Sequence, residues 1–296
     1  MTATSSSLSE LLYPGLKTVF GSHVDQWEPE YTKIFDDETS NKSYENYQEL
    51  ISFGAVPESA EGVSTTYDDP AQGYKSQLVN KKYTLGFKVT REMVEDDQYA
   101  EISKLSKALA QSVGDTIETL GANILNNGSS GGGAGADGEQ LFSTAHKYGN
   151  GSTYSNKIAV AADLSLTSYE QATIDIAALT DGRGKKIKVK PKRLIISPTF
   201  ARVAKQILGS ELTPESAYNA INPFKGDVEF VISHYVTDAD AWFLRTSEDG
   251  LICQKRVLPE FTKENDFDTD IAKFKTYFRM LFSWYNPRSI YGSPGA

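Results

Sequence analysis

The chain has 296 residues, of which 39% are hydrophobic and 23% charged, with a formal net charge of −9. This balance excludes a disordered chain, and the acidic surplus excludes a protein whose main task is to coat nucleic acid. A single cysteine, Cys253, excludes an internal disulfide and a cysteine-based zinc site, and we expect it to serve in packing.

The termini and the hydrophobic runs carry no targeting signal. The N-terminal sequence lacks a basic region followed by an apolar one, so we expect no signal peptide. No run approaches the roughly 20 apolar residues that span a bilayer. The sequence therefore predicts a soluble protein with no membrane partner.

The first eighty residues divide into an arm and a hairpin. Residues 1–50 are polar and irregular, and predict an arm that packs on something else, with at most a short helix around Leu8–Leu12 before Pro14. Residues 51–80 place strand-like flanks around a polar centre, Glu58–Gly73. This predicts two strands that reach out to a tip longer than the usual loop of about 2–5 residues.

A strand and a long helix follow. "KKYTLGFKVT" alternates and predicts a half-buried strand, while Thr90 can cap a short first turn. Apolar residues then recur at steps of three and four from Ile102 to Ile124, which predicts a helix over residues 97–126. We expect its opposite face to meet solvent; that face carries Lys104, Lys107, Gln111, Asp115 and Glu118.

The glycine-rich stretch "NNGSSGGGAGADG" leaves the carboxyl end of this helix. A phosphate loop would lie before a helix, where the dipole is positive, and would carry a lysine. We therefore expect a pliable connector.

Residues 153–255 predict a compact α+β unit. A capping box at Thr167 and Glu170 opens a helix to about Thr180. Ser197, Pro198 and Gly209 bound a second helix. "VEFVIS" predicts a strand, and "AWFLRTSEDGLICQKR" predicts a hairpin that turns at residues 248–250.

The final strand "AKFKTYFRMLFSW" alternates over more than a dozen residues and is a candidate partner for "YTLGFKV".

Motifs for chemistry are weak. Asp266, Asp268 and Asp270 resemble the start of a calcium loop, but the required glycine and glutamate are missing, so a solvated strand entry is favoured over a weak cation site. The histidines, His23, His146 and His234, are far apart and favour local hydrogen bonding over metal ligation. An acidic chain offers many candidate carboxylate pairs, so hydrolysis by two carboxylates is left open as an alternative.

A basic run lies between Arg183 and Arg193. Lys186, Lys188 and Lys190 alternate with apolar residues. This favours an exposed edge strand protected by lysines. The alternative is a contact with nucleic acid or with an acidic neighbouring chain.

Several segments together resemble the major capsid proteins of tailed bacteriophages, most closely phage Mu-like major head subunits. They are "YTKIFDDETSNKSYENYQELISFGAVPE", "EGVSTTYDDPAQGYKSQLVNKKYTLGFKVTREMVEDDQY", "LFSTAH" and "FTKENDFDTDIAKFKTYFRMLFSWYNPRSIYG". The resemblance implies an α+β, Hong Kong 97-type capsid fold. Its parts would be an N-terminal arm (1–50), an extended loop (51–80), a peripheral domain (81–152 and 256–296) with a spine helix (97–126), and an inserted axial domain (153–255).

The resemblance also implies a structural function without catalytic residues, cofactor or metal. Hexamers and pentamers would form an icosahedral shell around double-stranded DNA, with the virion as location and the host bacterial cytoplasm as the place of assembly. The partners would be a separate scaffolding protein, a portal and a decoration protein. An encapsulin-like compartment shell and a carboxylate-dependent hydrolase are the alternatives.

The resemblance implies, in addition, that the extended loop lies over a neighbouring subunit. The expected inter-subunit contacts of this loop are Glu58, Glu61, Tyr67, Asp68, Asp69, Gln72, Tyr74 and Lys75. Lys186, Lys188 and Lys190 are candidates for an edge contact.

Overall fold

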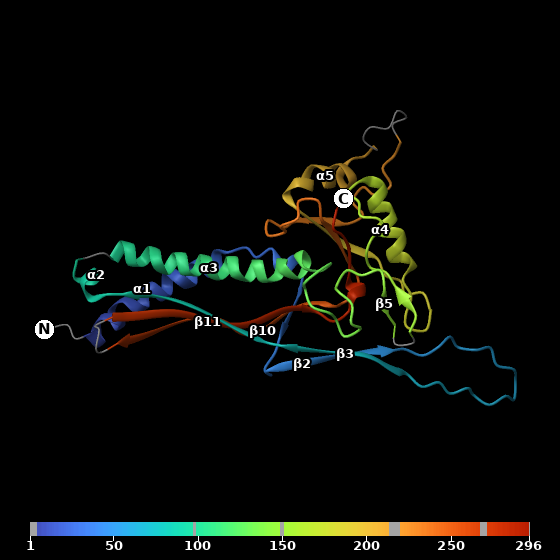
Figure 1. Ribbon diagram of the computed structural model, residues 1–296, viewed down its shortest axis with the longest axis horizontal. Coiled ribbons are helices and arrows are strands. Elements are labelled where there is room, and N and C mark those ends of the chain that lie inside the picture. The colour runs from blue at the N-terminus through green and yellow to red at the C-terminus, as the bar shows by residue number, and fades with distance from the viewer. Residues whose placement is uncertain (1–4, 97–98, 149–150, 213–219, 267–270, 296) are drawn as a thin grey trace.

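The computed structural model describes residues 5–96, 99–148, 151–212, 220–266 and 271–295, and for residues 5–11 and 99 only the backbone. An elongated part on the left of Figure 1 carries the longest helix and strands, a smaller α/β part rises at the right, and a hairpin projects beneath it. The helices are α1 (Ser5–Gln26), α2 (Arg91–Glu95), α3 (Tyr99–Asn126), α4 (Leu166–Ala178) and α5 (Ala201–Gly209). The first six strands are β1 (Asp36–Thr39), β2 (Tyr44–Ile51), β3 (Ala71–Val79), β4 (Lys81–Val89), β5 (His146–Lys147) and β6 (Thr153–Tyr154). The others are β7 (Pro191–Ile196), β8 (Glu229–Ile232), β9 (Trp242–Thr246), β10 (Leu251–Asp266), β11 (Ile271–Trp284) and β12 (Ile290–Ser293).

The elongated part is built on a sheet of strand order β1-β10-β11-β4. β11 pairs antiparallel with both β10 and β4, which confirms the predicted pairing of the final strand with "YTLGFKV". Its alternate residues Phe274, Phe278 and Phe282 are buried in one core with α1 and α3. The period of two in β11 therefore defines a helix-covered face and an opposite, charged face.

The predicted long helix is confirmed as α3, whose 28 residues span about 42 Å at about 1.5 Å per residue. The Thr90 cap on α2 is also confirmed, because its side chain accepts from the Met93 amide. The expectation that Glu118 faces solvent is wrong. Glu118 is only 4% exposed, because the chain between α1 and β1 passes over it and donates two backbone N–H groups to its carboxylate.

The N-terminal region is more helical than the sequence indicates. α1 runs through Pro14 for 22 residues, so the expected short helix is wrong in length. Leu12, Leu16 and Phe20, four residues apart, are buried in the core shared with α3. Burying each of these side chains stabilises the fold by about 1.5–3 kcal/mol. Together they outweigh the ~3 kcal/mol cost of an internal proline.

The smaller part holds the sheet β12-β9-β7-β8 with α4 and α5 packed beside it. The capping box of α4 is formed by Ser165 and Ser168, two residues before the predicted pair, since the Ser165 side chain accepts from the Ser168 amide. β8 confirms the strand predicted from "VEFVIS". β12 pairs antiparallel with β9, so the end of the chain returns to this sheet.

The predicted hairpin at residues 248–250 is wrong. β9 pairs with β7 and β12, whereas β10 pairs with β1 and β11, so the turn carries the chain from one sheet to the other. Both strands are apolar and buried at this point, and local alternation cannot tell which partner each one takes.

The glycine-rich stretch forms turns between α3 and β5. Gly131, Gly133 and Gly138 have positive φ angles, a backbone conformation that residues with a side chain rarely adopt. Gly135 lies against Trp284, where an added Cβ would be 2.2 Å from the indole ring. Part of the stretch is therefore packed on β11, and its pliability stays a prediction.

Candidate functional site

The most exposed apolar surface lies on the projecting hairpin. β2 and β3 pair antiparallel, and residues 52–70 continue beyond them as an unpaired loop (Figure 1). Residues 44–79 carry seven of the fourteen large apolar side chains that are exposed in the described part of the chain. They are Tyr44, Leu50, Phe53, Val56, Val63, Tyr67 and Val79. Such a concentration on an element without its own core makes the hairpin the candidate interaction surface.

The residues predicted to act in the extended loop fall into two groups. Glu58, Glu61 and Tyr67 lie on the loop and are exposed, Tyr67 to 92%. Gln72, Tyr74 and Lys75 instead lie on β3. There the Gln72 side chain accepts from Gln48 at 3.0 Å, and Tyr74 faces a cavity at the base of the hairpin.

Asp68 and Asp69 are held by the chain's own basic turn. Arg183 donates from Nη1 to Asp68 Oδ2 at 2.6 Å and from Nη2 to the Asp69 carbonyl at 2.7 Å. The Gly54 amide donates to the same Asp68 oxygen at 2.7 Å. The hydrogen bond from Arg183, followed by that from Gly54, holds the pKa of Asp68 below its usual value.

Sequence reasoning missed this pairing, although "YDDP" and "GRGKK" are the acidic and basic runs that form it. We call the contacts of Arg183 and Lys185 with residues 52–54 and 68–69 the loop clamp. Lys185 Nζ contributes a hydrogen bond to Ser52 Oγ at 3.3 Å.

The basic run does not form the predicted edge strand. Residues 187–190 lie outside the strands, and the ladder with β9 begins at Pro191, which faces Thr246. Lys186, Lys188 and Lys190 are nevertheless exposed, while Val189 between them is buried. The Ser247 amide donates to the Lys190 carbonyl, and the paired ladder with β9 starts only at the next residue. Their contact with a neighbouring chain stays a prediction.

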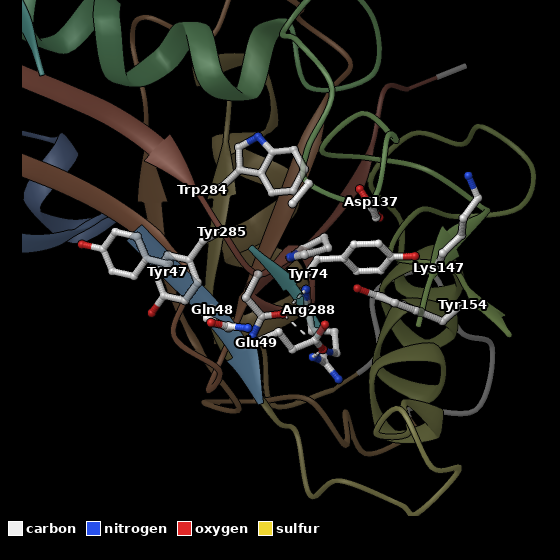
Figure 2. Close-up of a pocket in the computed structure, with 13 residues that line it drawn as sticks. Tyr47, Gln48, Glu49, Tyr74, Asp137, Lys147, Tyr154, Trp284, Tyr285 and Arg288 are labelled. Carbon is white, nitrogen blue, oxygen red and sulfur yellow. Dashed lines mark hydrogen bonds and ion pairs between the residues drawn. The ribbon is translucent and has the colours of Figure 1, made fainter. Parts of the chain in front are cut away.

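The base of the hairpin is fixed to the body at a cavity of about 110 Å³ (Figure 2). Tyr47 on β2 stacks on Tyr285 with ring centroids 4.5 Å apart. Glu49, two residues along the same strand, forms an ion pair with Arg288. Both partners follow β11, so β2 is tied to the segment that leaves the first sheet.

Arg288 also joins a third segment to this base. Its guanidinium carbon lies 5.9 Å from the Tyr148 ring centroid and 5.8 Å from that of Tyr154. Cation–π contacts of this kind add to the ion pair with Glu49. The charged and aromatic groups around the cavity are thus engaged with one another, which suits an anchor better than a catalytic site.

His146 is fully buried and stacks on Tyr154, with ring centroids 5.3 Å apart. Its Nδ1 lies 2.6 Å from Asp137 Oδ2, and its Nε2 lies 3.1 Å from the Leu141 carbonyl oxygen. Burial raises the pKa of Asp137, but the hydrogen bonds from His146 and from the Glu139 amide outweigh it and leave that pKa below its usual value. The expectation of a locally hydrogen-bonded histidine is confirmed here.

On the face of the first sheet that points away from α1 and α3, the β4–β11 half is basic, while Glu260 and Glu264 lie on the β10 half. Lys82 faces Arg279 across the β4–β11 ladder, and Lys88 faces Lys273, which is itself paired with Asp266. Like charges directly opposite each other destabilise a sheet. Lys275 adds a further exposed cation on this face. In a chain of net charge −9, such a local arrangement favours an acidic binding partner.

Groups that could hold a metal or act as nucleophiles are dispersed. No cluster of three His, Cys, Asp or Glu residues was found in the described ranges. Asp266 pairs with Lys273 at 2.7 Å, whereas Asp268 and Asp270 lie outside the described residues. Cys253 is buried as expected, and burial raises the pKa of its thiol to about 12, which leaves it unreactive. No described helix is long and apolar enough to cross a membrane.

A long helix on a sheet, a separate α/β part and a projecting hairpin together define the fold of a capsid subunit. A chain in the capsid of bacteriophage JBD30, decorated with minor capsid protein trimers, matches with a TM-score of 0.58 at 16% identity. That match covers 72% of this chain and 92% of the other. The mature capsid of bacteriophage PhiM1 matches with a TM-score of 0.58 at 10% identity, over 90% of this chain and 87% of the other.

A virus-like particle from Pyrococcus furiosus has the same fold. It matches with a TM-score of 0.50 at 12% identity and covers 94% of this chain and 97% of the other. A search of curated proteins gives no match.

The sequence identifies the family. The family model described as "Phage capsid protein" matches residues 75–293. The protein therefore belongs to the phage capsid protein family, whose members are structural proteins of the bacteriophage virion. This confirms the resemblance to tailed-phage capsid proteins, and the assignment to the Mu-like group stays a prediction.

Proposed function

We propose that this protein is the major head subunit of a tailed bacteriophage, which assembles as hexamers and pentamers into an icosahedral shell around double-stranded DNA. The observation that carries the proposal is the hairpin with its seven exposed apolar side chains, on a chain with a capsid fold. An element that exposes apolar side chains and has no core of its own can bury them by lying on a second copy of the chain.

The basic β4–β11 half of the first sheet's outer face is the surface that we assign to receive the loop of a neighbouring subunit. Residues 55–67 contain Glu58 and Glu61 and no lysine or arginine. Lys82, Lys88 and Lys275 on the sheet offer the opposite charge. Opposite charges on two such surfaces steer association and fix its register. In this arrangement α1 to β1 form the arm, strands β4, β10 and β11 with α3 the peripheral domain, and the β7 sheet with α4 and α5 the axial domain.

Other phage proteins complete this proposal. A separate scaffolding protein, a portal and a decoration protein would join the shell in the host cytoplasm. The JBD30 capsid with its minor capsid protein trimers supports a decorated shell.

A compartment shell that encloses proteins is the second candidate. The similarity to the virus-like particle from Pyrococcus furiosus, over nearly the full length of both chains, favours it. The contents of purified particles separate the two candidates. Nuclease-protected double-stranded DNA supports the phage head, and a co-purifying enzyme without DNA supports the compartment.

The test of the proposal is expression of the full chain, alone and with the proteins encoded beside it, followed by sizing and negative-stain microscopy. We expect closed shells, and none from a variant that lacks residues 58–73. Val56→Asp places a charge on the most exposed valine of the loop and should abolish shells. Val160→Asp, at a valine 78% exposed outside the hairpin, is the matched control and should assemble. Persistent monomers of the wild-type chain under all these conditions would refute the proposal.

A further inference from the structure

The loop clamp divides the extended loop into a held part and a free part. The two arms of the loop pass the turn that follows α4 at residues 52–54 and 68–69. Arg183 and Lys185 in that turn hold both arms there by hydrogen bonds. The Gly54–Asp68 hydrogen bond joins the two arms to each other. Every residue of the segment 55–67 beyond them is exposed.

The fit at the clamp is close on the backbone as well. Ile51 at the end of β2 packs on Gly182, where an added Cβ would lie 3.3 Å from the Ile51 side chain. An added Cβ at Gly54 would lie 3.3 Å from the Asp68 carboxylate. The loop is therefore fixed against the turn at residues 51–54 and 68, and this contact sets the direction in which residues 55–67 project.

We propose that Arg183 and Lys185 are positioning residues for assembly, which orient the loop before contact so that residues 55–67 reach a second copy of the chain. This inference rests on the proposed shell function and goes beyond it in one respect. Asp68 and Asp69, which the sequence suggested as contacts to a neighbour, act within their own subunit, and the inter-subunit contact shifts to Val56, Val63 and Tyr67.

The chemistry of the free segment supports a second copy as the partner. Its three exposed apolar side chains, Val56, Val63 and Tyr67, have no core of their own. Its two charges are acidic, and the exposed face of β4 and β11 on another copy is basic. A loop without the clamp would sample many directions, and only the fraction that points correctly could dock.

Charge reversal and its repair test the clamp. Arg183→Asp places two carboxylates against each other, and Asp68→Arg does the same with two guanidinium groups. Each single variant should lower the rate of shell assembly by about fivefold or more, since losing an exposed pair shifts a population by up to about that factor and reversal adds repulsion. The double variant should recover part of the rate, because the ion pair returns with its members exchanged while the bonds from Gly54 and to the Asp69 carbonyl stay lost. Arg202→Asp, a reversal at an exposed arginine on α5, is the control and should assemble normally.

A measurement on unassembled subunits separates this inference from the shell proposal. Hydrogen exchange at the Gly54 amide should be faster in both single variants, with an unchanged Tm, because Arg183→Asp releases the Asp68 carboxylate and Asp68→Arg removes the acceptor of this amide. The double variant restores the ion pair but not the acceptor, so its Gly54 amide should stay fast. If the wild-type chain forms no shells, the shell function fails, and unchanged exchange in the single variants would still overturn the clamp by itself. Single variants that assemble like the wild type would overturn the positioning role.

Discussion

Glu118 on α3 makes the stability of the subunit depend on pH. Its carboxylate is buried and accepts the backbone N–H groups of Glu30 and Tyr31, while the Glu30 side chain turns outward to His234. Burial, reinforced by the nearby Glu30 charge and opposed by the hydrogen bond from the Glu30 amide, raises the pKa of Glu118 from 4.5 to about 7. The folded subunit therefore holds a proton on Glu118 at a pH where the unfolded chain has released it.

The sign and size of the effect follow from this difference. A raised folded-state pKa stabilises the folded subunit fully below pH 4.5, and this contribution is lost as the pH rises through about 7. Since one pKa unit is worth about 1.4 kcal/mol, the free energy of unfolding should rise by roughly 2–3 kcal/mol between pH 8 and pH 5.

Urea unfolding of the unassembled subunit, followed by tryptophan fluorescence at both pH values, measures this rise. Glu118→Gln removes the titrating group and should lose the rise, although its amide cannot accept the Tyr31 N–H group and its overall stability should drop by about 1–3 kcal/mol. Equal pH dependence in the two proteins would refute the assignment to Glu118.

Three further changes test the packing and the anchor. Phe278→Ala should lower the free energy of unfolding by about 3–5 kcal/mol because the ring is 2% exposed in the first core, whereas Leu258→Ala, at 62% exposure, should change it little. Gly21→Ala in α1, where an added Cβ meets nothing within 4 Å, should raise the Tm through an increase of about 0.5–1 kcal/mol. Arg288→Ala should leave the Glu49 carboxylate without its partner and speed hydrogen exchange in β2, and unchanged exchange there would contradict the anchor.

The sequence was informative where one element carries its own pattern. The apolar stripe of α3 and the alternation in β4 and β11 predict these elements correctly, because most of the side chains that set the period lie in the core. Leu85 and Leu105 are exposed exceptions. The turn of the chain at residues 248–250 could not be read. β9 and β10 are apolar on both sides of the turn, and only tertiary packing sends them to different sheets.

Polar contacts between distant segments were the other gap. Glu118 looks like a surface residue because its helix neighbours are charged, and only the chain that crosses it makes it buried. The pairing of Asp68 with Arg183 joins residues 115 positions apart. Such pairs have no local period, so composition can show that both charges exist but not that they meet.

The central claim is that the hairpin of one subunit builds the shell by lying on another. Cryo-electron microscopy of particles assembled from the wild-type chain tests it most directly. We expect residues 55–67 of each subunit in contact with the β4–β11 face of a neighbour, with Lys82 and Lys88 near Glu58 or Glu61. Shells in which this loop touches only its own subunit or solvent would contradict it.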